Sequence, residues 1–255
     1  MMDTAQVEQR REPDGTGPEG VGSEGSQRPE PDPEIKPRAR AEFLAGMSRT
    51  EVLRASPPMF DTPWLNRLSR VHPAVVPVIF LPAITVLFAL ALSSLGVGTA
   101  LLWAVGGYFF WTLTEYWLHR IVFHFEPQKG IGAQLHWIIH GVHHDHPSDP
   151  MRLVMPPSVS VPLATLFILL FVAVLGAHPG LAVGAGFLAG YHFYDMMHYY
   201  LHHRTPKTAF GLWLRELHMR HHFQDHERGF GISAPYWDWV FRTAPQKVTR
   251  RPVAR

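Results

Sequence analysis

Cysteine is missing from all 255 residues of the chain. Its absence excludes disulfides, iron–sulfur clusters, thiolate-ligated haem and cysteine-ligated zinc sites. An excess of charge of one sign is also missing, because 23 Lys and Arg stand against 21 Asp and Glu and leave a formal net charge of +2. So small a positive excess argues against a nucleic-acid partner, which would require many phosphates to be neutralised.

Aromatic residues are absent from residues 1–42, where Pro, Gly, Glu and Arg dominate. Such a segment buries too little apolar surface to offset its ordering entropy, so we expect residues 1–56 to be disordered. It has no apolar core of a signal peptide. Ser48 and Glu51 have the spacing of a capping box, which would start a short helix unless the match arises by chance. We expect a membrane domain over residues 57–243 and a basic tail over residues 244–255.

Long apolar runs occupy much of the remaining chain, and each is close to the ~20 residues that a helix needs to cross a bilayer. These runs are roughly Pro73–Leu95, Thr99–Leu118, Val159–Ala177 and Leu181–Tyr200. Short connections join the first run to the second and the third to the fourth. The pattern predicts an all-α integral membrane fold with four transmembrane helices arranged as two hairpins. A soluble bundle of unusually apolar helices is the alternative.

Positive charge is missing from both predicted hairpins. No Lys or Arg occurs between Arg70 and Arg120, and none occurs between Arg152 and Arg204. All basic residues therefore fall on the side of the N-terminal segment, the central loop and the C-terminal segment. The positive-inside rule places that side in the cytoplasm. We expect the function to reside in a helical cap on the cytoplasmic face.

The histidines, 17 in all, are concentrated in four motifs: HRIVFH, HGVHH, HYYLH and HMRHH. Each motif lies at a predicted cytoplasmic helix end or in a cytoplasmic segment. The motifs supply ten candidate metal ligands, which are His119, His124, His140, His143, His144, His198, His202, His218, His221 and His222.

Spacing within the motifs brings the imidazoles together. Residues three and four apart share a helix face, so each HxxHH motif could direct its three histidines at one centre. His119 and His124 are five apart, which a continuous α-helix does not align, so we expect the helix to end or unwind there. Ten ligands are too many for one ion, and the set predicts two ions with four to six ligands each.

Ligand type alone leaves zinc, copper, iron and nickel open. A catalytic zinc site usually has three protein ligands and a water, whereas an all-histidine site for two metals at the ends of membrane helices favours iron and dioxygen chemistry. Zinc could occupy the same positions in a purified sample. Imidazoles gathered around metals would be neutral, because protonated rings repel one another and cannot coordinate.

Two carboxylates fall inside the apolar runs, where an ionisable side chain is costly and usually functional. Glu115 lies one turn before His119, and Asp195 lies close before His198. Because a metal-bound imidazole needs an acceptor for its other N–H group, we expect both carboxylates to serve histidine ligands in this way. A helix-capping or surface-directed acid is the alternative. The histidines beside the motifs are expected to be outer partners or surface residues: His136, His146, His203 and His226.

With these motifs in this order, the sequence resembles the fatty acid hydroxylase superfamily, which includes sterol desaturases and oxidases. Within it, the chain looks most like the fatty acid 2-hydroxylases that act on sphingolipid acyl chains. The resemblance covers roughly residues 57–243 and is carried by FFWTLTEYWLHRIVFHFE, HGVHHDHPSDPMRLVMPP, YDMMHYYLHH and LHMRHHFQDHERGFGISAPYWDWVF.

The resemblance implies two iron ions that use O₂ to hydroxylate the acyl carbon next to the carbonyl. It also implies that Tyr194 and Asp195 help to position the substrate. No cytochrome b5-like segment is recognised in residues 1–56, although many eukaryotic 2-hydroxylases carry such a domain. We therefore expect electrons from a separate donor, a ferredoxin or a free cytochrome b5. Lys is rare beside Arg and the sequence has no C-terminal dilysine or KDEL-type signal, so we expect a bacterial plasma membrane as the location.

Other functions remain open at this point. The same motifs serve sterol C-4 oxidation, carotenoid ring hydroxylation and desaturation within the superfamily. A zinc transporter or store would need a polar path across the membrane, and the hairpin tips offer little besides His178. A membrane zinc hydrolase would need a general base, for which Glu115 is available, but ten histidines exceed its needs.

Overall fold

The computed structural model describes residues 38–127 and 129–246, and every regular element in these residues is a helix. The predicted all-α class is therefore confirmed for the part of the chain described. Most of the segment expected to be disordered, residues 1–37, lies outside it, and so do residues 247–255 of the predicted basic tail.

Two short helices fall in the segment expected to be disordered, α1 (Arg38–Leu44) and α2 (Arg49–Arg54). The structure therefore differs from the prediction of disorder over these residues. The capping box is present, because the Ser48 backbone N–H donates to the Glu51 carboxylate over 2.8 Å and the Ser48 hydroxyl accepts from the Glu51 N–H. Helix α2 is fastened to the rest of the molecule, since the carbonyl of its residue Leu53 accepts a hydrogen bond from the Ser148 N–H.

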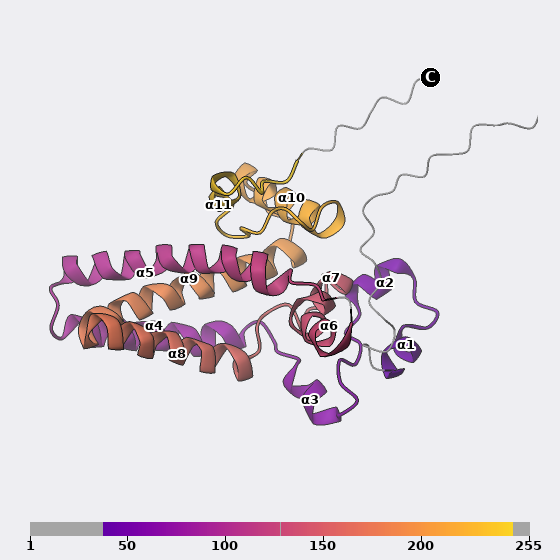
Figure 1. Cartoon of the computed structure of the whole chain (residues 1–255), viewed down its shortest axis with the longest axis horizontal. Coiled ribbons are helices and arrows are strands. Elements are labelled where there is room, and N and C mark those ends of the chain that lie inside the picture. The colour runs from indigo at the N-terminus through magenta and orange to yellow at the C-terminus, as the bar shows by residue number, and fades with distance from the viewer. Residues whose placement is uncertain (1–37, 128, 247–255) are drawn as a thin grey trace, which may run out of the picture.

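Four long helices form the body of the molecule and lie side by side in Figure 1. The first two of these helices are connected at the left end of the bundle in the figure, and the last two are connected at the same end. They are α4 (Val75–Leu92), α5 (Val97–Trp117), α8 (Pro157–Leu175) and α9 (Ala177–His203). Each overlaps one of the four predicted apolar runs.

Three stretches of helix are long and apolar enough to cross a membrane: Val75–Leu92, Val97–Phe123 and Pro157–Leu175. Helix α9, the fourth predicted span, differs from them because its second half carries His192, Asp195 and His198. It also differs in burial, since it packs against α4, α5 and α8 and buries much of its length. The other three helices bury few of their residues.

Glycines let α5 and α9 approach until their backbones touch. A Cβ atom at Gly107 would overlap the carbonyl oxygen of Val183, and one at Gly186 would overlap the carbonyl oxygen of Ala104. Small residues at such crossings permit the close packing on which helix association in membranes depends. The relative height of α5 and α9 is thereby set by direct backbone contact.

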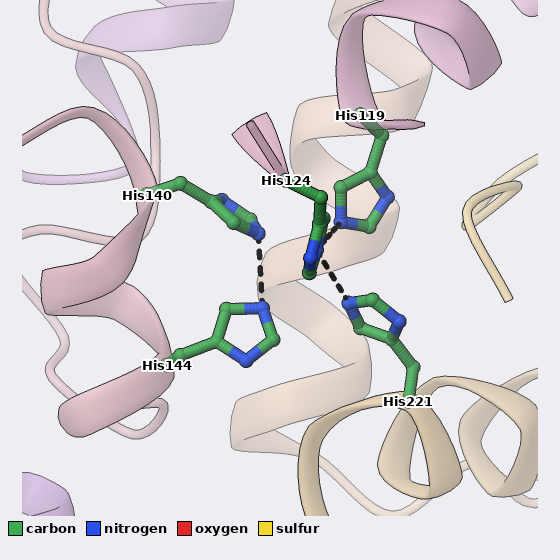
Figure 2. A group of neighbouring side chains, drawn as sticks. All are labelled: His119, His124, His140, His144 and His221. Atoms are coloured by element: carbon green, nitrogen blue, oxygen red, sulfur yellow. Dashed lines mark hydrogen bonds between the residues drawn. The ribbon is translucent and has the colours of Figure 1, made fainter. Parts of the chain in front are cut away.

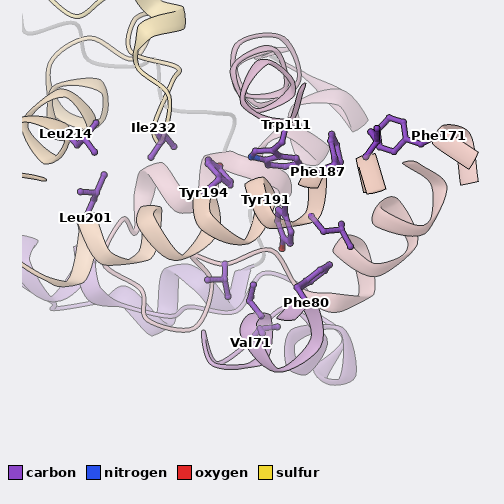
Figure 3. Packing of buried hydrophobic residues seen from close by; sticks show 14 residues of the cluster. Val71, Phe80, Trp111, Phe171, Phe187, Tyr191, Tyr194, Leu201, Leu214 and Ile232 are labelled. Atoms are coloured by element: carbon purple, nitrogen blue, oxygen red, sulfur yellow. The ribbon is translucent and has the colours of Figure 1, made fainter. Parts of the chain in front are cut away.

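An aromatic core fills the space between the helices (Figure 3). The Trp111 ring meets the Phe187 ring edge-on at a centroid distance of 5.1 Å and the Tyr191 ring at 5.3 Å. On the other side of Tyr191, Phe80 of α4 approaches at 4.8 Å. These contacts tie α4 and α5 to the half of α9 that precedes its histidines.

The remaining helices lie near the end of the bundle opposite the hairpin connections or along its side (Figure 1). They are α3 (Pro63–Leu68), the π-helix η2 (Leu118–Phe123), α6 (Gly130–His136), the π-helix η3 (Trp137–Gly141), α7 (Val142–Asp145), α10 (Ala209–Phe223) and α11 (Tyr236–Val240).

Replacement of Gly186 by Ala tests the α5–α9 contact. We expect Gly186→Ala to cost about 3 kcal/mol or more, because an added methyl meets backbone rather than a side chain that can move. Thermal unfolding and the yield of monodisperse protein in one detergent would measure the loss. Gly106→Ala is the matched control, since its Cβ would have open space within 4 Å. Equal behaviour of the two variants would contradict the proposed role of the contact.

Candidate metal centre

All ten predicted ligands come together, and they form two groups of five. The first group is His119, His124, His140, His144 and His221, shown in Figure 2. The second group is His143, His198, His202, His218 and His222. Within each group, one nitrogen of every ring lies within 4.8 Å of the corresponding nitrogens of the others. The described residues thus provide two positions where a metal ion could be held.

A change of helix type aligns His119 with His124. The α-helix α5 continues as the π-helix η2, and the His124 N–H donates to the His119 carbonyl over 3.2 Å, a bond that spans five residues. Residues five apart then lie on one face, which α-helical winding does not allow. The expectation that the helix ends or unwinds there is refined: the helix widens instead.

Each HxxHH motif is divided between the two groups, contrary to the expectation that its three histidines share one centre. His140 and His144 belong to the first group and His143 to the second, while His218 and His222 belong to the second and His221 to the first. Neighbouring residues point about 100° apart around a helix, so adjacent histidines diverge. Because adjacent histidines point in different directions, one motif can supply side chains to both groups.

The distances between ring nitrogens fit metal coordination. Nε2 atoms are 2.7 Å apart in His202 and His218, and 2.9 Å apart in His140 and His144. Two imidazole nitrogens that bind one ion at about 2.1 Å and at right angles to each other lie about 3 Å apart. Ten buried nitrogen donors directed at two points are the donor set expected of two transition-metal ions.

Burial keeps these rings in the form that binds metal. Removal from water lowers the pKa of His143 to about 3. It also lowers the pKa of His140 well below its usual value, with a further contribution from His144 nearby. Burial disfavours the charged imidazolium, so these two rings are neutral at pH 7 and have a lone pair available.

Backbone carbonyls hold two of the rings in position. His119 Nδ1 donates to the carbonyl of Phe230 and His221 Nδ1 donates to the carbonyl of Arg228, both over 2.7 Å. A proton on Nδ1 leaves Nε2 as the acceptor, which suits coordination of a metal. Sequence reasoning missed these partners, because any residue can offer a carbonyl. The GFGIS string that contains Phe230 was the available signal.

Two carboxylates support the loop that carries these carbonyls. Asp238, which is 2% exposed, accepts from the backbone N–H groups of Phe230 and Gly231 over 2.9 Å each. Glu115 accepts from the Ser233 backbone N–H over 2.8 Å and from the Ser233 hydroxyl. Glu115 was expected to accept directly from a histidine ligand, and its contacts instead reach the ligand through the loop.

The other two predicted site residues, Tyr194 and Asp195, are buried in α9, about one turn before His198. The Asp195 carboxylate accepts a hydrogen bond from the Tyr191 hydroxyl over 3.0 Å, where an imidazole N–H had been expected. The Tyr194 ring lies 5.8 Å from the His198 ring between centroids. Their roles in substrate positioning stay predictions.

A brace that was not predicted joins the N-terminal helices to α7. The Asp145 carboxylate accepts from Trp137 Nε1 over 2.9 Å and from Arg40 Nη2 over 3.1 Å. The guanidinium of Arg40 also lies over the Trp137 ring at 5.7 Å. Because Asp145 directly follows His144, the brace restrains the segment that supplies histidines to both groups.

Comparison with known proteins agrees with this site. Residues 104–243 match the family model described as fatty acid hydroxylase. The chain belongs to the fatty acid hydroxylase family. The matched residues include all ten histidines of the two groups. With three helices long and apolar enough to cross a membrane, this member of the family is an integral membrane protein.

Individual relatives share a third or more of the aligned residues. A ceramide very long chain fatty acid hydroxylase of Schizosaccharomyces pombe is 36% identical over 73% of this chain and 52% of its own length. The dihydroceramide fatty acyl 2-hydroxylase FAH1 of Arabidopsis thaliana is 39% identical over 67% of this chain and 72% of its own length. The chain thus spans about half of the length of the yeast relative.

A solved structure has the same fold. The hydroxylase domain visible in full-length scs7p superposes with a TM-score of 0.72 at 33% sequence identity, and the match covers 83% of this chain and 85% of that one. The predicted resemblance to fatty acid 2-hydroxylases is thereby confirmed at the level of family and fold.

Loss of the Arg40 brace is expected to loosen metal binding. In Arg40→Ala, we expect the metal to dissociate at a chelator concentration about 10-fold lower, because loss of an outer partner typically weakens metal sites about 10- to 100-fold. Metal content after graded chelator treatment measures this, and Arg40→Lys should restore part of the retention. Arg49→Ala, an exposed residue of α2, is the control. Unchanged retention in Arg40→Ala would refute the brace.

Proposed function

We propose that the chain is a di-iron membrane hydroxylase that uses O₂ to hydroxylate a lipid acyl chain at carbon 2. The observation that carries the proposal is the pair of five-histidine groups, buried where apolar helices end. When bound there, two iron ions would supply the activation of dioxygen that inserts an oxygen into a C–H bond. The protein holds their ligands neutral and keeps water away from them.

The donor set favours iron over a zinc function. A catalytic zinc ion generally has three protein ligands and an open position, whereas five imidazoles converge on each position here. A zinc transporter would need polar side chains along its path, but the long helices α4 and α8 have no charged residue and no histidine. Imidazole suits iron as well as zinc, so it is the number of ligands at each position that favours iron.

A small apolar cavity of about 20 Å³ marks a path by which an acyl chain could approach the metal positions if the helices around it move apart. It lies between α5, α8 and α9, and Leu118, the neighbour of His119, forms part of its wall. The other side chains that line it are mainly apolar, among them Trp111, Phe167 and Phe187. Because Leu118 directly precedes His119, a chain that entered by this path would come close to the first histidine group. The names of the relatives, ceramide and dihydroceramide acyl hydroxylases, suggest an amide-linked acyl chain.

We also infer that α4, α5, α8 and α9 all cross the membrane as two hairpins, with the metal positions on the cytoplasmic side. The absence of Lys and Arg from residues 71–119 and 153–203 supports this orientation. In it, α9 is the span enclosed by the other three, which explains how its polar residues are accommodated.

Lipid analysis tests the function. The chain would be expressed in a host that lacks 2-hydroxy lipids, with a ferredoxin or cytochrome b5 and the matching reductase supplied, and hydrolysed acyl chains would be analysed by mass spectrometry. We expect 2-hydroxy acids that gain a further two mass units under ¹⁸O₂. His221→Ala should lower the product by more than about 100-fold, since loss of an outer partner alone costs about 10- to 100-fold.

The control variant is His178→Gln, which alters a histidine at the hairpin tip outside both groups. It should leave the product unchanged. A new double bond in place of a hydroxyl would identify a desaturase. Oxidised sterols or carotenoids without 2-hydroxy acids would assign one of the other reactions of the superfamily.

A further inference from the structure

Helices α10 and α11 expose a patch of apolar side chains that no other described element covers. Trp239 is 57% exposed, Val240 61% and Phe210 63%. The Trp239 ring stacks on Trp213 at a centroid distance of 5.6 Å, so the two helices form one surface. We name this surface the aromatic ledge, made of Phe210, Leu212, Trp213, Tyr236, Trp239 and Val240. Patches of this kind mark interaction sites.

The aromatic ledge is fastened to the flank of α5, one of the helices suited to cross a membrane. The Tyr236 hydroxyl and Trp237 Nε1 both donate to the Thr112 hydroxyl, over 2.7 Å and 3.1 Å. The Tyr236 ring also lies parallel to the Phe109 ring at 6.4 Å. Thr112 precedes the end of α5 by five residues, or about 8 Å at 1.5 Å per residue. The ledge therefore lies beside the span.

The polar groups of α11 are turned away from the exposed face. Asp238, the one charged residue in the helix, is 2% exposed and accepts from the loop N–H groups and the Thr243 hydroxyl. The basic residue Arg242 lies two residues beyond the end of the helix and is exposed. An apolar aromatic face with a cation at its edge is the composition found where proteins meet the membrane–water interface.

The exposed surface of α5 next to the ledge is also apolar. Val105 is 65% exposed and Phe109 54%, and both lie in the stretch suited to cross a membrane. Phe109 itself contacts Tyr236 and Trp237 of α11. The surface that faces acyl chains on α5 therefore passes directly into the ledge, which argues for lipid as the occupant of both.

We propose that the aromatic ledge is seated in the cytoplasmic leaflet of the membrane, against lipid acyl chains and glycerol backbones. The proposal rests on α5 crossing the membrane, and it deepens the proposed function. The cap is then partly embedded, and the loop that holds His119 and His221 is fixed near the depth of the lipid carbonyls. An acyl carbon next to a carbonyl reaches the metal positions without leaving the leaflet.

Single cysteines provide the test, because the native chain has none and each variant carries one thiol. A nitroxide would be attached to Val240→Cys on the ledge, to Leu102→Cys on the exposed face of α5, and to Glu42→Cys in the exposed part of α1. The full chain would be placed in phosphatidylcholine nanodiscs. Collision with O₂, which concentrates in the bilayer, would be compared with collision with a water-soluble nickel chelate.

We expect the label at Val240 to favour O₂ over the nickel chelate, as the label at Leu102 does, whereas the label at Glu42 favours nickel. A Val240 label that behaves like the Glu42 label, with Leu102 still lipid-exposed, overturns the ledge proposal and leaves the span intact. Water access at Leu102 as well removes the span on which the proposal rests. Spin–spin broadening at Val240 between two copies, or exclusion from both reagents, assigns the ledge to a protein contact and overturns the proposal.

Discussion

Ten imidazoles must be buried together without charge, and much of the structure follows from that constraint. A protonated ring in this volume would meet its neighbours as like charges in a medium of low polarity. Each ring must therefore carry its proton on one nitrogen, held by a hydrogen-bond acceptor, and leave the other nitrogen free to coordinate a metal ion. The loop carbonyls of Phe230 and Arg228 fix protons for two rings, and Asp238 and Glu115 keep that loop in place.

The bundle supplies the rigidity that such a site requires. To hold metal ions, the histidines of η2 and those of α9 would have to keep their relative heights to fractions of an ångström, because metal–nitrogen distances vary little. Direct backbone contact at Gly107 and Gly186 leaves no layer of side chains between the two helices that could shift. Aromatic packing around Trp111 and Tyr191 then prevents α9 from rotating.

Residue type and spacing were sufficient to predict the helical class, the four long helices and the gathering of the ten histidines. Long apolar runs and repeated HxxHH motifs are strong local signals. The division of each motif between two centres was not predictable, since it depends on how separate helices meet. Partners made of backbone, such as the Phe230 carbonyl, leave no trace in residue type. Arg40 was overlooked because it lies within the stretch without aromatic residues, where disorder was expected.

The shared HxxHH motifs have a consequence for the assembly of the centre. One turn of helix, from His140 to His144, supplies nitrogens to both positions, and so does the turn from His218 to His222. An ion that binds at the first position orders the backbone from which the second draws its ligands. The two positions share their backbone segments, so we expect both to bind their metal ions together and to lose them together.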